Sequence, residues 1–287
     1  MRGSIRIGDG ARRGKSMRAT PREAAMNAKQ QVKELVKDAF PSIWLQWHFM
    51  KRPKSAEREL SYLEKVIPDD AVTVDVGANC GLYTRRLARL SRQVHAFEPS
   101  QQMARLLRRT SARNVSVHEI ALSDHDGDAE LFIPKGDDGL VHGLASLEAR
   151  TDSSAKMISA HVPIARLDAV IDQDVAFVKI DVEGHELNVL NGAVELLERC
   201  QPVFLVEAED RHRAAATRSV FEFFRSRSYR GFFLKDNEVI DVEAFDPGTL
   251  QDADALRPDG GRKDGQFYVN NFFFFPRHLD GESILSG

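Results

Sequence analysis

"VDVGANCGLYTRRLARL", Val74–Leu90, indicates a buried strand, a tight loop and a helix in direct succession. The apolar run ends at Val76, the loop is Gly77–Gly81, and the helical spacing begins at Leu82. The glycines at both ends of the loop permit φ > 0 and a close approach of the main chain to a ligand. A pyrophosphate site would have the pattern G-x-G-x-x-G, whereas this loop reads G-A-N-C-G and follows Asp75. The stretch therefore favours an α/β nucleotide-binding type of fold whose ligand is not a dinucleotide.

Strands and helices alternate on both sides of this stretch. The expected strands are 72–78, 93–99, 115–123, 176–184, 202–210, 229–234 and 265–276, and the expected helices are 82–91, 100–113, 185–200 and 214–229. Nearly continuous apolar strands that alternate with helices indicate a parallel sheet covered on both faces. Little helix separates the last two strands. We therefore predict a Rossmann-like α/β fold, mostly parallel, with an antiparallel hairpin at the C-terminal edge.

The chain divides by composition into four segments. We expect a disordered basic tail at 1–20, a helical and aromatic segment at 21–58, the main domain at 59–278 and a C-terminal tail at 279–287. Within the main domain, the excursion 124–168 is predicted to contain a turn, an added strand and a loop rich in Gly, Ser and Asp, after which the chain returns in a strand that begins at 161. A long loop inside a compact domain is usually functional or disordered.

Both tryptophans, Trp44 and Trp47, lie beside a basic cluster in the N-terminal segment. One interpretation is that they pack on the main domain, where each buried ring contributes a large apolar area. The other is a peripheral membrane contact by residues 41–54, with the rings at the headgroups and Lys51 and Arg52 facing acidic lipid. Packing is favoured because the aromatic stripe is short and core aromatics are common.

Composition and charge exclude several classes of protein. The net charge of −3 combines about +8 in residues 1–60 with about −11 in the remainder, and an acidic body does not suit a protein that binds nucleic acid through its phosphates. The two cysteines form neither a disulfide framework nor a metal motif. The sequence has no apolar run of about 18 residues and no signal-peptide core. We expect a cytoplasmic protein without a nucleic-acid partner.

The ends of the first three predicted strands carry polar groups in an order that identifies a ligand. Asp75 suits an ammonium or sulfonium group, and Glu98, 23 residues later, can accept hydrogen bonds from two ribose hydroxyls. Ser123 and Asp124, at the end of the next strand, are placed to contact an adenine amino group. Amino acid, sulfonium, ribose and adenine occur together in S-adenosylmethionine. The predicted cofactor-binding residues are Asp75, Gly77, Asn79, Gly81, Glu98, Ser123 and Asp124.

Several motifs resemble the FkbM family of S-adenosylmethionine-dependent methyltransferases. They are TVDVGANCGLYT, VHAFEPS, EIALSDHDG, RLD, VKIDVEGHELNVLNGA and NNFFFFP, within Ser61 to Pro276. KIDVEGHEL is the most specific of them. The resemblance implies a class I methyltransferase in a family that mostly methylates hydroxyl groups on sugars, glycolipids or polyketide-type products. Cys80 is an unusual residue for the first loop.

The catalytic groups are expected at the end of the fourth strand. Asp181 and Glu183 are alternate residues, so an extended strand would point both to one side, where a carboxylate could remove the acceptor's proton. Alternatively, Asp181 caps a loop, and Glu183 or Glu186 stabilises the following helix. His142, in the irregular loop, is a third candidate base because a neutral imidazole accepts a proton at physiological pH. No metal site is predicted.

Together these features predict an O-methyltransferase acting on a small-molecule or glycan hydroxyl acceptor. The alternative is a catalytically degenerate member of the same fold that binds the cofactor without transferring its methyl group. Intact Asp75, Glu98 and Asp181 favour the enzyme, because a decayed copy would be free to lose them. An NAD-dependent oxidoreductase is disfavoured by the missing G-x-G-x-x-G pattern.

Overall fold

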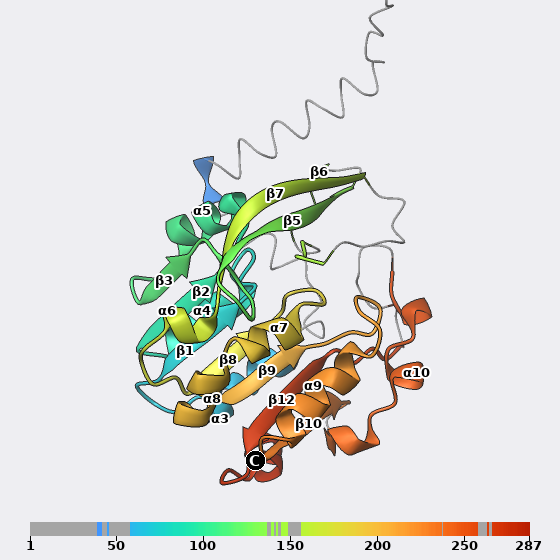
Figure 1. Ribbon diagram of the computed structural model, residues 1–287. Coiled ribbons are helices and arrows are strands. Elements are labelled where there is room, and N and C mark those ends of the chain that lie inside the picture. Colours follow the sequence, from blue (N-terminus) through green and yellow to red (C-terminus); the bar gives the residue numbers. More distant parts are fainter. Residues whose placement is uncertain are drawn as a thin grey trace, which may run out of the picture.

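A twisted, eight-stranded sheet forms the centre of the protein in the computed structural model (Figure 1). The structure describes residues 39–41, 45, 58–136, 139–140, 142, 145–148, 156–236, 238–257, 263 and 266–287. The strand order is β11-β10-β12-β9-β8-β1-β2-β3. The strands are β1 (Val72–Val76), β2 (Gln93–Phe97), β3 (Val115–His118), β8 (Phe177–Ile180), β9 (Val203–Glu207), β10 (Tyr229–Lys235), β11 (Glu238–Asp241) and β12 (Asn271–Pro276).

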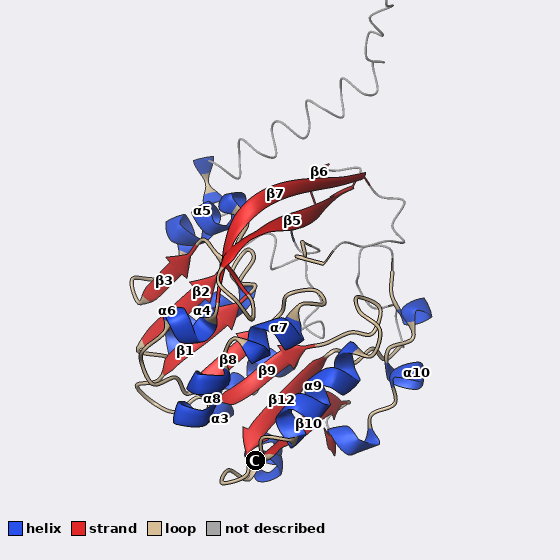
Figure 2. Cartoon of the chain, in the orientation of Figure 1, coloured by secondary structure: helices blue, strands red, loops and turns tan. Residues whose placement is uncertain are grey.

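Helices cover both faces of this sheet (Figure 2). They are α3 (Leu63–Val66), α4 (Leu82–Leu90), α5 (Gln101–Thr110), α6 (Leu167–Val170), α7 (Glu186–Asn191), α8 (Val194–Cys200), α9 (Ala216–Arg225), α10 (Pro247–Leu250) and α11 (Gly281–Ser286). Short 3-10 helices lie at Arg58–Ser61, Val242–Ala244 and Ala253–Ala255. Among the described residues, no helix has both the length and the apolar character needed to cross a membrane.

Alternate residues of the strands supply two separate cores. In β9, Phe204 and Val206 belong to the core under α6, α7, α8 and α9, whereas Val203 and Leu205 belong to the core under α3, α4 and α11. This alternation follows from the period of two in a strand. All five residues of β1 are buried, because the strand lies between neighbours and under helices on both sides. The predicted α/β fold is confirmed.

The C-terminal edge of the sheet is antiparallel, as predicted, although its strands differ in extent. Strand β12 lies between β9 and β10 and is antiparallel to both. It begins at Asn271, whereas the expected strand began at residue 265. Strand β11 forms a hairpin with β10 and was not predicted, because EVID is only four residues long and none of its residues is fully buried.

Two other predicted elements are divided in the structure. The strand expected over 115–123 ends at His118, and Ala121–Leu122 forms a separate strand, β4, which pairs with β7. The helix expected over 185–200 breaks into α7 and α8 at Gly192. A Cβ on Gly192 would lie 2.0 Å from the carbonyl oxygen of Ser123. Because glycine has no side chain, the chain after β4 can pack closely against the break between α7 and α8.

The excursion after the third strand forms a second sheet, with strand order β4-β7-β5-β6. Its long hairpin joins β5 (Gly127–Gly136) to β7 (Lys156–Ala165), and β6 (Gly139–Leu140) pairs with the end of β5. The hairpin rises from the carboxyl edge of the main sheet (Figure 1). Leu131, Val162 and Ile164 form its small core with Ala121 of β4. The sequence predicted one added strand and a return strand here, but not their pairing.

The structure describes only a few residues of the N-terminal segment but all of the C-terminal one. The predictions for residues 1–20, and those for Trp44 and Trp47, lie outside the described residues. Leu45 is fully buried against Cys80, Met103 and Leu106, so the N-terminal segment contacts the main domain at this point. The segment expected as a C-terminal tail contains α11, which packs Leu285 into the core.

Leu45→Ala is expected to lower the free energy of unfolding by about 2–4 kcal/mol, because it removes a fully buried side chain and leaves a cavity beside the loop that carries Cys80. Phe40→Ala is the control, since Phe40 is 58 % exposed and its loss should change stability by less than about 0.5 kcal/mol. Urea unfolding of both variants gives the comparison. Equal stability of the two would show that Leu45 does not anchor the segment.

Candidate active site

A cleft lies at the carboxyl ends of β1, β2 and β8, under the hairpin of the second sheet. Ligands of open α/β sheets bind at this edge. Apolar side chains form part of the cleft wall, among them Phe97, Ile120, Leu122 and Leu131. Six of the ten predicted site residues line it: Gly77, Asn79, Glu98, His142, Asp181 and Glu183. The other four, Asp75, Gly81, Ser123 and Asp124, lie outside this lining.

The loop after β1 is shaped by left-handed backbone conformations. Gly77 has φ 79°, Asn79 φ 48° and Gly81 φ 87°. A Cβ on Gly77 would lie 1.8 Å from the carbonyl oxygen of Asp181, and one on Gly81 would lie 2.6 Å from Cδ2 of Leu107. The glycines therefore let the loop approach the end of β8 and the face of α5. This close approach brings the two halves of the cleft together.

Asp75 lies behind the loop and is almost completely buried. Its Oδ2 accepts a hydrogen bond of 2.5 Å from the hydroxyl of Thr84, in the first turn of α4. Burial raises the pKa of Asp75 to about 6, against the hydrogen bond from Thr84 and the charge of Lys179. In the structure this carboxyl connects β1 to α4, whereas the sequence suggested that it would face the ligand.

Glu98 joins the loops that follow β1 and β2. Its Oε2 accepts from the backbone N–H of Asn79 and its Oε1 from that of Ser100, both at 2.8 Å. Burial raises the pKa of Glu98 to about 7, against these two backbone hydrogen bonds. A carboxylate oxygen has two lone pairs, so each can accept a further hydrogen bond from a ligand in the cleft.

His142 lies on the Glu98 side of the cleft, where its ring contacts the residues at the start of α5. Its Nδ1 is 3.0 Å from the hydroxyl of Ser100, and its Nε2 is 2.8 Å from Oε1 of Gln102. Since the amide oxygen only accepts, Nε2 carries the hydrogen and Nδ1 accepts from Ser100. Both ring nitrogens are thus engaged. His142 therefore contributes to the wall of the cleft. These two contacts do not support its predicted role as a base.

Ser123 and Asp124 connect the second sheet to α7 and lie away from the end of β3. The hydroxyl of Ser123 is 2.9 Å from Nε2 of His185, and Oδ2 of Asp124 accepts from the amide of Asn188 at 3.1 Å. The prediction that these residues end the third strand of the main sheet was wrong, because β4 pairs with β7 instead. Ile120 to Leu122 line the cleft at this position.

Asp181 and Glu183 reach the cleft by a turn, although the sequence predicted an extended strand. Strand β8 ends at Ile180, and Glu183 and Gly184 have φ of 53° and 104°. The side chain of Glu186, in the first turn of α7, accepts from the N–H of Gly184 at 2.8 Å, so Glu186 stabilises the start of the helix. The helix cap is His185, four residues after Asp181. Asp181 is therefore not the N-cap residue of α7.

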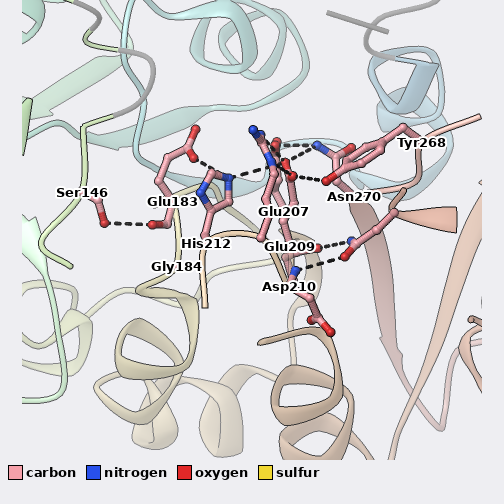
Figure 3. A network of polar contacts seen from close by, with 12 residues as sticks. Ser146, Glu183, Gly184, Glu207, Glu209, Asp210, His212, Tyr268 and Asn270 are labelled. Carbon is pink, nitrogen blue, oxygen red and sulfur yellow. Dashed lines mark hydrogen bonds and ion pairs between the residues drawn. The ribbon is translucent and has the colours of Figure 1, made fainter. Parts of the chain in front are cut away.

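A network of charged side chains lies beside this turn (Figure 3). The side chain of His212 is 5 % exposed, and its Nε2 is 2.7 Å from Oε2 of Glu183 and 3.8 Å from Oε1 of Glu209. Asn270, just before β12, donates to Glu207 and to Glu209 at 2.6 Å and 3.0 Å. His212 and Glu209 were not among the site residues predicted from the sequence. Their one signal was a cluster of charged residues, EAEDRH, directly after a buried strand.

Comparisons with known proteins give a family and a set of similar solved structures. A family model described as "Methyltransferase FkbM domain" matches residues 75–230, more than half of the chain. No curated protein sequence gives a match.

The described residues contain no group of three or more His, Cys, Asp or Glu side chains arranged to hold a metal ion.

Solved structures resemble the chain at low sequence identity. The methyltransferase FkbM from Methylobacillus flagellatus KT is 17 % identical over 72 % of this chain and 44 % of its own, with a TM-score of 0.45, so the chain spans less than half of that protein. An rRNA methylase from Streptococcus thermophilus is 14 % identical over 78 % and 95 % of the two chains, with a TM-score of 0.42. A Streptococcus mutans protein in complex with S-adenosylhomocysteine (SAH) is 10 % identical over 78 % and 98 %, also with 0.42.

Proposed function

The chain belongs to the FkbM methyltransferase family, and from that premise we propose that it methylates a hydroxyl group on a sugar, glycolipid or secondary-metabolite acceptor. The enzyme is a methyltransferase, and its methyl donor is S-adenosylmethionine. The observation that carries the proposal is the meeting of two carboxyl groups, Asp181 and Glu183, with the loop after β1 and with Glu98 in one cleft.

The cleft residues fit the cofactor group by group. Glu98 can accept hydrogen bonds from ribose hydroxyls while it holds the loop at Asn79. The apolar wall of Phe97, Ile120 and Leu131 suits the flat face of adenine. Gly77 keeps the main chain close to the place where the amino-acid part would bind. When bound, S-adenosylmethionine supplies an electrophilic methyl carbon on a sulfonium.

The acceptor hydroxyl must lose its proton as the new carbon–oxygen bond forms. A carboxylate within hydrogen-bonding distance of that hydroxyl can take the proton. We assign this role to Asp181, which directly follows β8 and lines the cleft. Glu183 would then accept a hydrogen bond that orients the acceptor. The acidic body, about −11 after residue 60, supports an uncharged hydroxylated acceptor over a nucleic acid.

Glu98→Ala is expected to weaken SAH binding by about 1.5–3 kcal/mol, the range for hydrogen bonds to a charged group. Calorimetry at pH 8 measures the loss. Glu119→Gln is the control, because Glu119 pairs with Arg108 at the surface outside the cleft and its variant should bind SAH normally. Unchanged affinity in a folded Glu98→Ala protein would remove Glu98 from the cofactor site.

The affinity of the wild type for SAH is expected to depend on pH through Glu98. The carboxylate form accepts the hydrogen bonds, and the pKa of this group is raised to about 7 by burial. Affinity should therefore be full above pH 7 and fall as pH decreases, by up to about tenfold per unit. In Glu98→Ala this dependence should be absent between pH 8 and pH 6. A pH-independent wild-type affinity over the same range would contradict the assignment.

Methyl transfer itself is tested with labelled S-adenosylmethionine and a panel of hydroxylated acceptors, including glycosides and a cell extract. A methyl ether that survives alkaline hydrolysis would support O-methylation, whereas a methyl ester would be cleaved. Tight SAH binding without transfer to any acceptor would instead favour the catalytically degenerate binding protein.

A further inference from the structure

The turn after β8 is held from two sides. The hydroxyl of Ser146, in the excursion of the second sheet, donates to the carbonyl oxygen of Glu183 at 2.8 Å. On the other side, His212 forms its ion pair with the Glu183 carboxylate (Figure 3). Glu183 has the left-handed φ of 53°, a conformation that side-chain-bearing residues seldom adopt without support. The main chain and the side chain of Glu183 are thus fixed separately.

Gly184 makes room for this contact. A Cβ at position 184 would lie 3.2 Å from Cβ of His212, tighter than an ordinary contact, and Gly184 also has φ 104°. The absence of a side chain lets the segment after β9 pack directly against the turn after β8. The Glu183–His212 contact is therefore supported by the local backbone as well as by charge.

The second carboxylate near His212 is already engaged by other groups. Glu209, 1 % exposed, accepts hydrogen bonds from the guanidinium of Arg211 and from the hydroxyl of Tyr268. Asn270 donates to it as well. Burial opposes the ionisation of Glu209, but these partners and His212 hold its pKa below the usual range. Glu209 therefore supplies a permanent negative charge behind His212.

His212 is cationic between these carboxylates. Burial opposes protonation of the imidazole, but the Glu183 carboxylate at 2.7 Å and the negative charge of Glu209 outweigh it and raise the pKa of His212 to about 9. A histidine that is already protonated at neutral pH cannot take the acceptor's proton. It can, however, keep a neighbouring carboxylate ionised and fixed in direction.

We propose that His212 is a positioning residue, which holds the Glu183 carboxylate in place at the cleft so that it can orient the acceptor hydroxyl. The inference rests on the proposed methyl transfer and adds to it a residue from the loop after β9. Glu183 touches the acceptor in this arrangement, whereas His212 acts only through Glu183. Glu209 and its partners hold His212 in turn.

The first test is an NMR pH titration of the His212 ring, assigned by triple-resonance spectra. The wild-type midpoint should be near pH 9. Glu183→Gln removes an opposite charge within hydrogen-bonding distance and should lower this midpoint by about 1–3 pH units. Glu130→Gln is the matched control, because Glu130 lies 3.9 Å from a different, exposed histidine, His161. An unchanged His212 midpoint in Glu183→Gln would overturn the inference.

The second test compares methyl transfer from labelled S-adenosylmethionine in His212→Gln, Glu183→Gln and the double variant. We expect His212→Gln to transfer roughly ten- to a hundredfold more slowly, with SAH affinity within about twofold of the wild type. The double variant should be no slower than Glu183→Gln alone, because His212 acts through Glu183. Wild-type transfer by a folded His212→Gln protein would overturn the inference.

Failure of the proposed function gives a different pattern. A wild type that binds SAH but transfers no methyl group would refute the enzyme assignment. The titration would then decide alone whether His212 holds Glu183, since it needs no acceptor and uses variants that retain His212.

Discussion

Gly77→Ala should destabilise the domain by about 2–5 kcal/mol and abolish SAH binding. The added Cβ would lie 1.8 Å from the carbonyl oxygen of Asp181 and 2.8 Å from its carbonyl carbon. Both atoms belong to the main chain, so no side-chain rotation can relieve the contact. Overpacking of this kind costs about 1–3 kcal/mol or more, and the left-handed φ of 79° adds about 1–2 kcal/mol for any residue with a Cβ.

The loss of binding has the same cause as the loss of stability. To admit a methyl group, the loop after β1 must move away from the end of β8, and this movement separates Gly77 and Asn79 from Asp181 across the cleft. Urea unfolding and calorimetry with SAH measure the two effects.

Gly248→Ala is the control for the Gly77 variant. Gly248 lies in α10, and its Cβ would meet only the Asp246 carboxylate, at 3.4 Å. Its stability should change by less than about 1 kcal/mol, because alanine suits a helix at least as well as glycine. If Gly77→Ala matched Gly248→Ala in stability and bound SAH normally, the close approach of Gly77 to Asp181 would be unimportant.

The elements that the sequence predicted correctly have a strong local signal. Strands β1, β8 and β9 are short runs dominated by β-branched and other apolar residues, and they are buried because they lie in the middle of the sheet. Strand β4 was assigned to the wrong sheet because its partner is β7, more than 40 residues away along the chain. The local pattern of two apolar residues, Ala121 and Leu122, contains no information about that partner.

The same distinction applies to the site. Gly77, Asn79, Glu98 and Asp181 follow strand ends directly, so the parallel topology alone places them at one edge of the sheet. His212 lies 29 residues after Glu183, in a charged segment that resembles a solvated loop. Its burial depends on the packing of that segment against the turn at Gly184, which no local pattern reveals.

Asp75 shows a further limit of reasoning from position alone. An acid near the end of the first strand suggested a ligand contact, but Thr84, nine residues later, accounts for its nearest hydrogen bond. The hydroxyl faces Asp75 because the left-handed Gly81 turns the chain sharply into α4. The direction of the Asp75 side chain therefore could not be inferred from its position in the sequence.

Asp181→Asn is expected to reduce methyl transfer by about 10²–10⁴-fold, which corresponds to ~3–5 kcal/mol of activation free energy. The amide keeps the shape of the side chain but cannot take the acceptor's proton. The backbone at this position is held independently, since the N–H of Asp181 donates to the carbonyl oxygen of Val76 at 3.0 Å. SAH affinity and melting temperature should therefore stay close to those of the wild type.

Asp168→Asn provides the opposite pattern and serves as the matched control. The carboxylate of Asp168 accepts from the backbone N–H groups of Glu195 and Leu196, at 2.9 Å and 2.8 Å, and so stabilises the first turn of α8 outside the cleft. Its variant should lose about 1 kcal/mol of stability and transfer methyl groups normally. Turnover, SAH affinity and melting temperature of the two variants together separate a catalytic carboxylate from a structural one. A stable Asp181→Asn enzyme with wild-type turnover would assign the proton transfer to Glu183 instead, and Glu183→Gln alone would then be inactive.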